Sequence, residues 1–559
     1  MRIARSWKRA FLIMMSMLCI AGCAPASPAP EPAADTESAA VTESAATATT
    51  AESAEPAAPA LPDVVEIPPL PACWEASELF TATVNGEAAP VYRCHAEYDV
   101  CAFSFRGEVT LEIDAGQTVK SVSVSPLAKE IPAEKSGRTV TITLTEPQYL
   151  IVKINALREL VIAADPAETD APPSEGAGVW NVAALGADPR GAASATAVIQ
   201  SAVDEASAAG GGVVYVPAGV YSIGNVELKS DVHLYLAPGA VLRADCADEF
   251  LRRSPYTIGD VTYSVTYMVT TQPNSKNVRV SGRGALDCRG THYREAKSWV
   301  VFAFVPNHTD GLVLDGVTIR DTGLWGTVIA YCRDVTITNT KHLNKPSTLG
   351  QNDAIDIVGS QNVTVRRTIA FSRDDPYSIK TYVTHNLFEG VGRAAEHILF
   401  EDCFCWTRCA AFKFGWGVEM GMRDITFRNC FVYACNLGLA VTHYGGSAAI
   451  SDVTYENIDI ENFLLDGSVW LLASVGTSKP GGNRKDWGSI KNLTVKNVNV
   501  RAAWKGQCLL GGHDKSHLLD GVAISGITIR GRACSTLAEM GVTKNEFARN
   551  VTLDGVPVD

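Results

Sequence analysis

The chain has 559 residues, of which 46% are aliphatic, aromatic or sulfur-containing. This length exceeds what one ordinary hydrophobic core organises, so we expect several units or one repetitive unit. The net charge of −13 excludes the broad basic surface that nucleic-acid binding requires, and we expect no nucleic-acid partner.

The N-terminal residues predict export. Four of the residues 2–9 are Lys or Arg, and an apolar run at 10–18 follows that is too short to span a bilayer as a mature helix. The letters IAGC then end at Cys23, which is similar to the end of a bacterial lipoprotein signal. We therefore expect residues 1–23 to be a signal peptide and Cys23 to carry lipid; an ordinary cleaved signal peptide is the alternative. The protein would be anchored to the membrane through this lipid, at the cell surface or in the periplasm.

The next two segments differ sharply in composition. Residues 24–72 are mostly Ala, Pro, Glu, Thr and Ser, and cannot bury enough apolar surface to offset the entropy of ordering. They predict a disordered tether. From 73 to 166, short segments alternate apolar and polar residues between Gly, Pro, Asp and Asn, which predicts a small antiparallel β-sandwich.

Residues 178–243 predict a strand, a turn and a helix. Ile199, Ala202, Val203 and Ala206 form one apolar stripe at helical spacing. The glycines that follow lack the Lys-Ser/Thr of a phosphate-binding loop and lead into a strand, so we reject such a loop. We expect the helix to cover one open end of the unit that comes next.

Beyond residue 270 the chain repeats a strand and a turn at intervals of about 20 to 40 residues, with connections of variable length, which is typical of a solenoid. The absence of long helical periodicity between the repeats argues against a βα barrel. We predict that residues 175–559 form a right-handed, single-stranded parallel β-helix, so that the fold class is all-β. The second residues of the nine repeated segments are Val278, Leu312, Val335, Val363, Ile398, Ile425, Val453, Leu493 and Val522.

Fifteen cysteines raise the question of disulfides and metals. An exported protein can form disulfides, and Cys94 and Cys101 are close enough in sequence to pair. Cys403 and Cys430 end two successive repeats in the same slot, so we expect them to stack in the core rather than to bind zinc. We expect no metal and no cofactor.

Five side chains between 351 and 382 are suited to acid–base chemistry: Asp353, Asp356, Asp374, Asp375 and Lys380. The step from Asp353 to Asp374 is close to the length of one short coil, so stacking would place them side by side. Carboxylates at such range cannot all ionise, and one pKa should rise. A protonated carboxyl beside an ionised one is what glycoside hydrolysis needs. The alternative is that these aspartates only hydrogen-bond turns.

At these residues the chain resembles the polygalacturonase family, glycoside hydrolase family 28, over about residues 178 to 535. The resemblance rests on an Ala-Leu-Gly-Ala-Asp entry and on the segments AGGGVVYVPAGVY, HLYLAPGAVL, LWGTVIAYCRDVTI, NDAIDI and RDDPYSIK. The chain also resembles the clan relatives of family 49, the dextranase and isopullulanase family.

The resemblance implies inverting hydrolysis of an α-linked polysaccharide. The family's Asn-Thr-Asp and Asp-Asp motifs correspond to Gln-Asn-Asp at 351–353 and to Asp374-Asp375. It implies that Asp374 is the general acid, which protonates the leaving oxygen, and that Asp353 and Asp375 hold and deprotonate the attacking water. Lys380 matches the Lys of the family's Ile-Lys near the site.

Two segments depart from the polygalacturonase pattern. The family's Gly-His-Gly is replaced by CAAFKFGWG with Lys413 and Trp416, and its Arg-Ile-Lys by GLAVTHYGG with His443 and Tyr444. We expect these four residues and Lys380 to bind substrate, with Trp416 and Tyr444 as stacking platforms. A structural role is the alternative for His443, and Trp325 is better explained by packing. FKFGWG and the small β domain are more similar to the dextranase family. A uronate and a neutral α-glucan or α-galactan therefore both remain open as substrates.

Two other functions remain open. A polysaccharide lyase also uses a parallel β-helix, with a basic residue such as Arg373 as proton acceptor. A non-catalytic carbohydrate-binding β-helix is the other. In each case the partner is a polysaccharide and we expect a monomer. Long connections near 341–351 and 464–490 would favour attack at chain ends if they closed one end of the binding face.

Overall fold

The computed structural model describes residues 62–258, 260–345, 350–388, 390–476 and 486–558. The predicted signal peptide, Cys23 and most of the predicted tether lie outside these residues. Among the described residues no helix has both the length and the apolar character that a membrane span requires. All described elements from Asp63 onward belong to one compact unit.

The predicted small β domain is present as two facing sheets of seven and five strands. Its strands are β1 (Val64–Glu66), β2 (Glu75–Ala76), β3 (Thr81–Val84), β4 (Glu87–Ala89), β5 (Val91–Arg93), β6 (Tyr98–Arg106), β7 (Val109–Asp114), β8 (Val122–Ser125), β9 (Glu134–Ser136), β10 (Thr139–Leu144), β11 (Gln148–Ile154) and β12 (Glu159–Pro166). Because β1 pairs with β6, the domain begins earlier than the predicted residue 73. Among these described strands all pairs are antiparallel except β6 with β12.

Cys94 and Cys101 are free thiols, so the disulfide considered for them is absent. Cys101 lies in the core between the two sheets. Cys94 belongs instead to the cluster that packs this domain against the rest of the chain. The two thiols therefore point to opposite faces of their sheet, where close spacing in sequence cannot bring them together.

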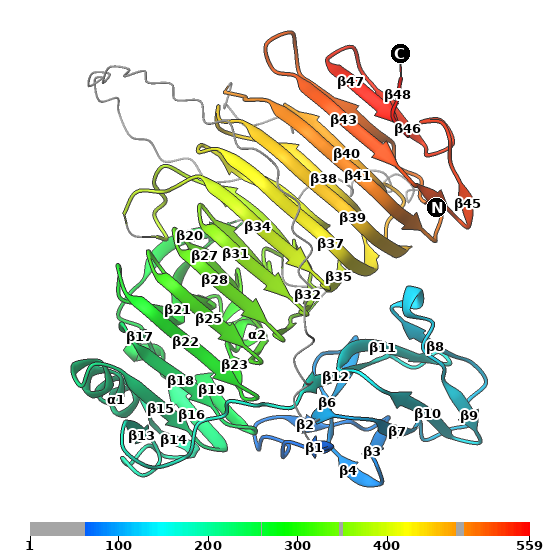
Figure 1. The fold of residues 1–559 in the computed structure, drawn as a ribbon. Coiled ribbons are helices and arrows are strands. Elements are labelled where there is room, and N and C mark those ends of the chain that lie inside the picture. Colours follow the sequence, from blue (N-terminus) through cyan, green and yellow to red (C-terminus); the bar gives the residue numbers. More distant parts are fainter. Residues whose placement is uncertain (1–61, 259, 346–349, 389, 477–485, 559) are drawn as a thin grey trace, which may run out of the picture. The chain divides into compact units, whose positions relative to one another are not determined.

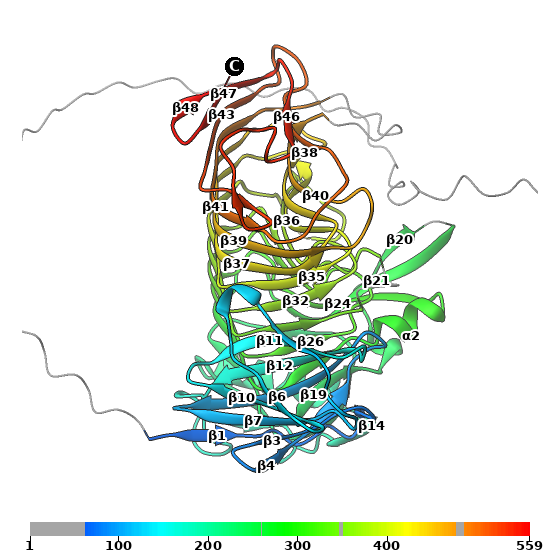
Figure 2. The same ribbon diagram turned by 90° about the vertical axis from the view of Figure 1, so that its right-hand side faces the viewer.

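The rest of the chain is a parallel β-helix, as predicted (Figures 1 and 2). Its 24-stranded sheet, the long sheet, holds two strands of most coils. They are β13 (Val179–Asn181), β14 (Arg190–Ser194), β15 (Gly212–Val216), β16 (Gly219–Ile223), β18 (Val232–Leu236), β19 (Ala240–Ala244), β22 (Lys276–Gly282), β23 (Ala285–Asp287), β25 (Asp310–Asp315), β26 (Thr318–Arg320), β28 (Arg333–Thr338), β29 (Lys341–Leu343), β31 (Gln361–Arg366), β32 (Ile369–Ser372), β34 (Ala395–Glu401), β35 (Phe404–Thr407), β37 (Met422–Cys435), β39 (Ile450–Phe463), β41 (Ile490–Val500), β43 (Leu519–Ser525), β44 (Thr528–Ile529), β45 (Arg532–Ala533), β47 (Ala548–Leu553) and β48 (Val556–Pro557).

A 12-stranded sheet, the site sheet, carries the candidate active site. Its strands are β17 (Val226–Leu228), β20 (Ser254–Ile258), β21 (Val261–Thr271), β24 (Trp299–Val305), β27 (Thr327–Ala330), β30 (Ile355–Val358), β33 (Tyr377–Thr381), β36 (Ala410–Val418), β38 (Leu437–His443), β40 (Val469–Val475), β42 (Cys508–Gly511) and β46 (Val542–Lys544). Strands of successive coils pair in parallel, for example β30 with β33.

The predicted repeat register is confirmed. The nine second residues, from Val278 to Val522, are direct Cα partners in one continuous row of the long sheet. All nine are buried in the solenoid core. Cys403 and Cys430 are free and buried in the same core, as the repeat slot predicts.

Helix α1 (Thr196–Ala208) lies beside the first coils and packs against β15 and β17, as expected of a cap (Figure 1). Its buried residues are the four of the predicted stripe. The other α-helix among the described residues, α2 (Gly290–Glu295), is a short turn before β24.

Asparagine ladders fix two corners of the coils. At the corner within the long sheet, Asn429, Asn457 and Asn497 all have positive φ, which Asn tolerates better than most residues. The Asn457 amide donates to Asn429 Oδ1 at 2.9 Å, and the Asn497 amide donates to Asn457 Oδ1 at 3.1 Å. A second ladder includes the Asn362 amide, which donates to Asp334 at 2.8 Å. The ladders hold the turns of successive coils in register.

Replacing Asn457 with Ala should lower the free energy of unfolding by about 1–2 kcal/mol, because alanine loses two ladder hydrogen bonds and disfavours positive φ. Urea unfolding measures the change. Asn457→Asp is the matched control, since it tolerates the turn and keeps an acceptor for Asn497, and it should lose less. Equal unfolding midpoints for Asn457→Ala and the parent protein would contradict this role.

The β domain supports the coil that precedes the candidate site. Tyr98 donates to the Asn344 carbonyl at 2.8 Å, and the Asn344 amide donates to the Asn352 carbonyl at 3.4 Å. The buried Lys341 ammonium also pairs with Asp165 of the β domain at 2.5 Å. The loop that ends at Asp353 is therefore linked by hydrogen bonds to the β domain.

Candidate active site

The three predicted catalytic aspartates come from two successive coils. Asp353 precedes β30, and Asp374 and Asp375 precede β33. Ile355 pairs with Tyr377, and the Ala354 amide donates to the Asp375 carbonyl at 3.2 Å. Asp353 is therefore aligned with Asp375 rather than with Asp374, one position away from the alignment that the spacing in sequence suggested.

Lys380 joins two buried carboxylates. Its ammonium lies 2.7 Å from Asp353 Oδ2 and also pairs with Asp356. Burial, reinforced by the neighbouring Asp356, raises the pKa of Asp353 well above its ordinary value, although Lys380 opposes this shift. Burial also raises the pKa of Asp356. Since one ammonium serves two carboxylates, the group favours retention of a proton.

Asp375 has a cation of its own. The Lys413 ammonium lies 2.6 Å from its Oδ2, and the Ala410 amide donates to its Oδ1 at 3.1 Å. Burial alone would raise the pKa of Asp375, but the ammonium groups of Lys413 and Lys380 outweigh it, and the pKa lies below its ordinary value. Asp375 is thus held as a carboxylate, which can accept a proton.

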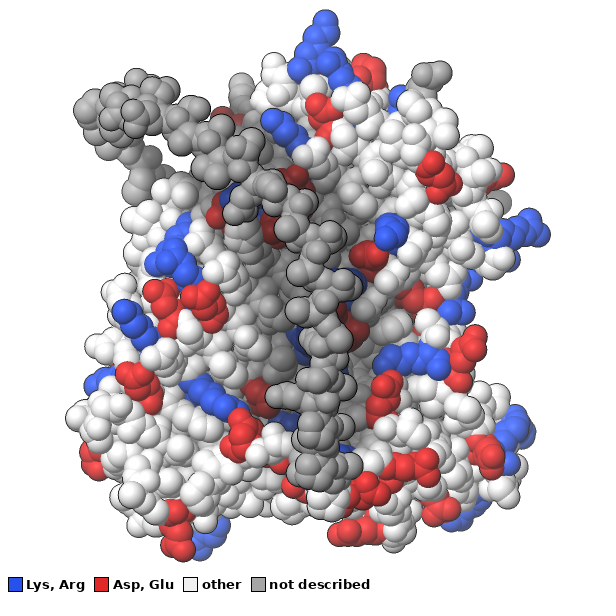
Figure 3. Space-filling model, viewed as in Figure 1, with Lys and Arg blue, Asp and Glu red and all other residues white. Residues whose placement is uncertain are grey.

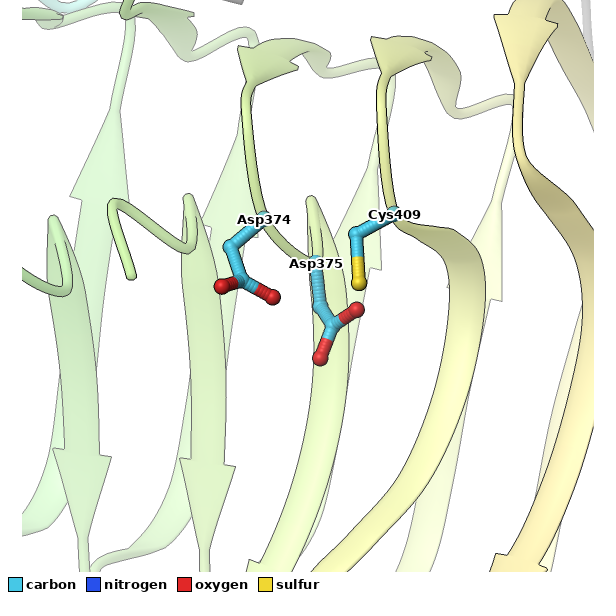
Figure 4. A group of neighbouring side chains, drawn as sticks. All are labelled: Asp374, Asp375 and Cys409. Carbon is cyan, nitrogen blue, oxygen red and sulfur yellow. The ribbon is translucent and has the colours of Figure 1, made fainter. Parts of the chain in front are cut away.

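Asp374 is the most accessible of the three aspartates. The backbone N–H of Gln351 donates to Asp374 Oδ2 at 3.0 Å. The Asn352 side-chain oxygen accepts the amide of Arg373 at 2.8 Å and that of Asp374 at 3.4 Å, which fixes the turn. The carboxyl group of Asp374 lies next to that of Asp375 (Figure 4).

Cys409 also belongs to this site, and sequence reasoning missed it. Its thiol and the carboxyl groups of Asp374 and Asp375 offer ligand atoms within 4.8 Å of one another, a set that could hold a metal ion (Figure 4). However, burial raises the pKa of the thiol, and Lys413 already supplies a positive charge to Asp375. The pairing of Tyr377 with Phe412 aligns Cys409 with Asp374, and only the paired strands give this register.

Two of the other predicted substrate-binding residues form an aromatic platform on the coils after the aspartates. The Trp416 side chain is 47% exposed, and its ring stacks on Tyr444 at 5.6 Å and 28°. Tyr382 donates to the Trp416 carbonyl at 2.8 Å, which anchors this part of β36. An exposed, supported indole suits the apolar face of a sugar ring.

The predicted contact of His443 with substrate is wrong, because its side chain is fully buried. Its Nε2 lies 2.7 Å from the Ala448 carbonyl, so it holds the connection after β38. Burial lowers the pKa of His443, which keeps the ring neutral. Lys380 and Lys413, which were predicted to bind substrate, lie next to the aspartates, and each is paired with one of them.

Known proteins with similar sequences are named rhamnogalacturonases and an endo-polygalacturonase. Probable rhamnogalacturonase A from Aspergillus oryzae is 24% identical over 314 residues, which cover 55% of this chain and 58% of that protein. An endo-polygalacturonase from Pectobacterium carotovorum is 23% identical over 348 residues, 57% of this chain and 80% of that protein. Rhamnogalacturonase A from Aspergillus aculeatus is 28% identical over 159 residues, and the chain spans only 30% of its length.

Two solved structures share the fold. The family 28 exopolygalacturonase of Yersinia enterocolitica matches with a TM-score of 0.52 and 15% identity, over 89% of this chain and 99% of that one. Dex49A from Penicillium minioluteum matches with a TM-score of 0.56 and 13% identity, over 87% of this chain and 96% of that one. The sequence model of the glycosyl hydrolases family 28 matches residues 214–547 of this chain, which include all the site residues described above. The chain therefore belongs to glycosyl hydrolases family 28.

Proposed function

We propose that this protein is a glycoside hydrolase that cleaves an α-linked polysaccharide with inversion at the anomeric carbon. The observation that carries the proposal is the pairing of two buried lysines with different aspartates around an accessible third. Lys413 favours the ionised form of Asp375, whereas Lys380 is shared between Asp353 and Asp356. An arrangement that separates the protonation of neighbouring carboxyls is suited to acid–base catalysis.

The proposed reaction assigns one role to each aspartate. Asp374, the accessible carboxyl, gives its proton to the glycosidic oxygen as the bond from that oxygen to the anomeric carbon breaks. Asp375 takes a proton from the water that attacks the opposite face of the sugar, and Asp353, aligned with it, orients this water. The reaction adds one water across the bond and leaves Asp374 ionised and Asp375 protonated. Exchange with solvent restores both groups.

We propose a pectin-type chain as the first choice of substrate, since rhamnogalacturonase and polygalacturonase are the names of the relatives. Trp416 on Tyr444 would stack one sugar ring. The lysines at the site are engaged by aspartates, so they offer little free positive charge to an anionic polymer. On the face drawn in Figure 3, acidic and basic side chains are interspersed. A neutral α-glucan or α-galactan is the second candidate.

The protein should release reducing ends from at least one polysaccharide in a panel of polygalacturonate, rhamnogalacturonan, dextran and an α-galactan. Proton NMR of the first product should show an anomeric configuration opposite to that of the cleaved bond. Retention would overturn the inverting mechanism. Growth of absorbance from an unsaturated product would indicate a lyase, and binding without cleavage of any polymer would indicate a carbohydrate-binding protein.

A further inference from the structure

Trp325 lies beside the aspartates, in the equivalent position of the preceding coil. The Gly326 amide donates to the Asp353 carbonyl at 2.8 Å, just as the Ala354 amide donates to the Asp375 carbonyl. Trp325, Asp353 and Asp375 are therefore aligned in three successive coils, and each lies two residues before a strand of the site sheet. On the coil before Asp353, this row therefore presents the indole of Trp325 instead of a carboxyl group.

On the coils up to and including that of Asp353, part of the outer face of the site sheet is covered. Phe302 of β24, Val328 of β27 and Val358 of β30 are buried in one apolar cluster. The cluster is closed by Phe388, which is only 6% exposed, from the connection after β33. A polysaccharide cannot lie on this part of the sheet without displacing that connection.

Three rings form the boundary of the covered region. The Trp325 ring stacks on Phe302 at 6.1 Å and 27°, and on Phe388 at 6.3 Å and 24°. The Lys380 ammonium lies 4.3 Å from the Trp325 ring centroid, and this ammonium pairs with Asp353. The aromatic wall, as we call Phe302, Trp325 and Phe388, thus stands directly against the proposed catalytic groups.

A cavity of about 450 Å³ adjoins the aromatic wall, and Phe302 and Phe388 line it. Polar side chains, among them Arg253, Thr270 and Asn386, line the rest. This volume is within the range of sites for small ligands. Phe302 and Phe388 therefore contact both the cavity and the Trp325 ring, which lies next to the aspartates.

We propose that the aromatic wall ends the substrate-binding face beside the aspartates, so that the enzyme acts at chain ends and releases one short product. The inference rests on the proposed function. The polymer would continue in the other direction, toward later coils, where Trp416 is exposed on Tyr444. The connections near 341–351 and 464–490, considered above for this role, lie partly outside the described residues, whereas Phe388 belongs to the connection after β33.

The first test follows products over time on the best polysaccharide of the panel. A chain-end enzyme yields one short product from the earliest time point, and solution viscosity falls little for each bond cleaved. An early mixture of intermediate oligomers with a steep fall in viscosity would overturn the wall while leaving the hydrolase proposal intact. Failure to cleave any polymer would overturn the proposed function, and this inference with it.

The second test opens the wall. Phe388→Ala should join the cavity to the substrate-binding face, and the main product should lengthen by at least one sugar unit. Val391→Ala is the matched control, since Val391 belongs to the same connection and is 63% exposed. It should leave product length unchanged. Melting temperatures of both variants confirm folding, and an unchanged product from folded Phe388→Ala would show that Phe388 is no boundary; if that variant does not fold, the time course of the parent protein decides.

Discussion

Asp374→Asn is expected to lower kcat by about 100- to 10,000-fold on the cleaved polysaccharide, the range that a general acid contributes. Asparagine has nearly the same shape and can still accept the hydrogen bond from the backbone N–H of Gln351. However, it has no acidic proton to give to the leaving oxygen. KM should change much less than kcat, because the sugar-binding surface is intact. Initial rates of reducing-end release, measured over a range of substrate concentrations, separate the two constants.

Asp424→Asn is the control for Asp374→Asn. Asp424 has a φ of 55° in a solenoid turn and faces His397, and it has no part in the proposed reaction. Asparagine suits this turn, so activity should match that of the parent protein. If Asp374→Asn retained the parent kcat, the acid would have to be sought elsewhere and the proposed mechanism would fail.

Removal of Lys413 should displace the pH dependence of the enzyme. In the parent protein burial acts to raise the pKa of Asp375, but the neighbouring ammonium holds that pKa below its ordinary value. Without the ammonium, burial dominates and the pKa rises. A base works only when ionised, so the acidic limb of the kcat/KM profile should move upward by about 1–3 pH units in Lys413→Ala. The loss of rate is greatest at acidic pH and recovers partly as pH increases.

Lys413→Arg distinguishes charge from packing in this experiment. Arginine keeps the positive charge beside Asp375, so the acidic limb should stay close to that of the parent protein, even if kcat falls because the guanidinium is larger. The same limb position in Lys413→Ala and the parent protein would show that Asp375 is not the base whose ionisation limits the rate.

The repeats made the solenoid predictable, because a strand that recurs with inward apolar residues has few ways to stack. The row from Val278 to Val522 followed from counting alone. Asp353, Asp374 and Asp375 were found by motif, but the match of Asp353 to Asp375 needed the register of β30 on β33, which only the paired strands give. The spacing in the sequence alone suggested Asp374 as the partner of Asp353, which is wrong by one residue.

Local patterns do not show what surrounds a buried side chain. His443 looked like a substrate contact because it replaces part of a family motif, but its side chain is buried and its Nε2 lies against the Ala448 carbonyl. Trp325 was expected to pack between coils; it does pack, and its ring also contacts Lys380, which belongs to a later coil. Cation–ring contacts of this kind depend on the connection between coils, which no local pattern encodes.

The ladder that includes Asn457 has a consequence for how this enzyme can be modified. In the long sheet the connection within a coil keeps one length over three successive coils, from Asp315 to Thr318, from Thr338 to Lys341 and from Arg366 to Ile369. The connections that follow site-sheet strands differ widely, from Val358–Gln361 to Thr381–Ala395. Segments grafted at the latter corners leave the ladder intact. Substrate range can therefore be redesigned, by exchange of the 382–394 segment for example, in a scaffold whose register is set elsewhere.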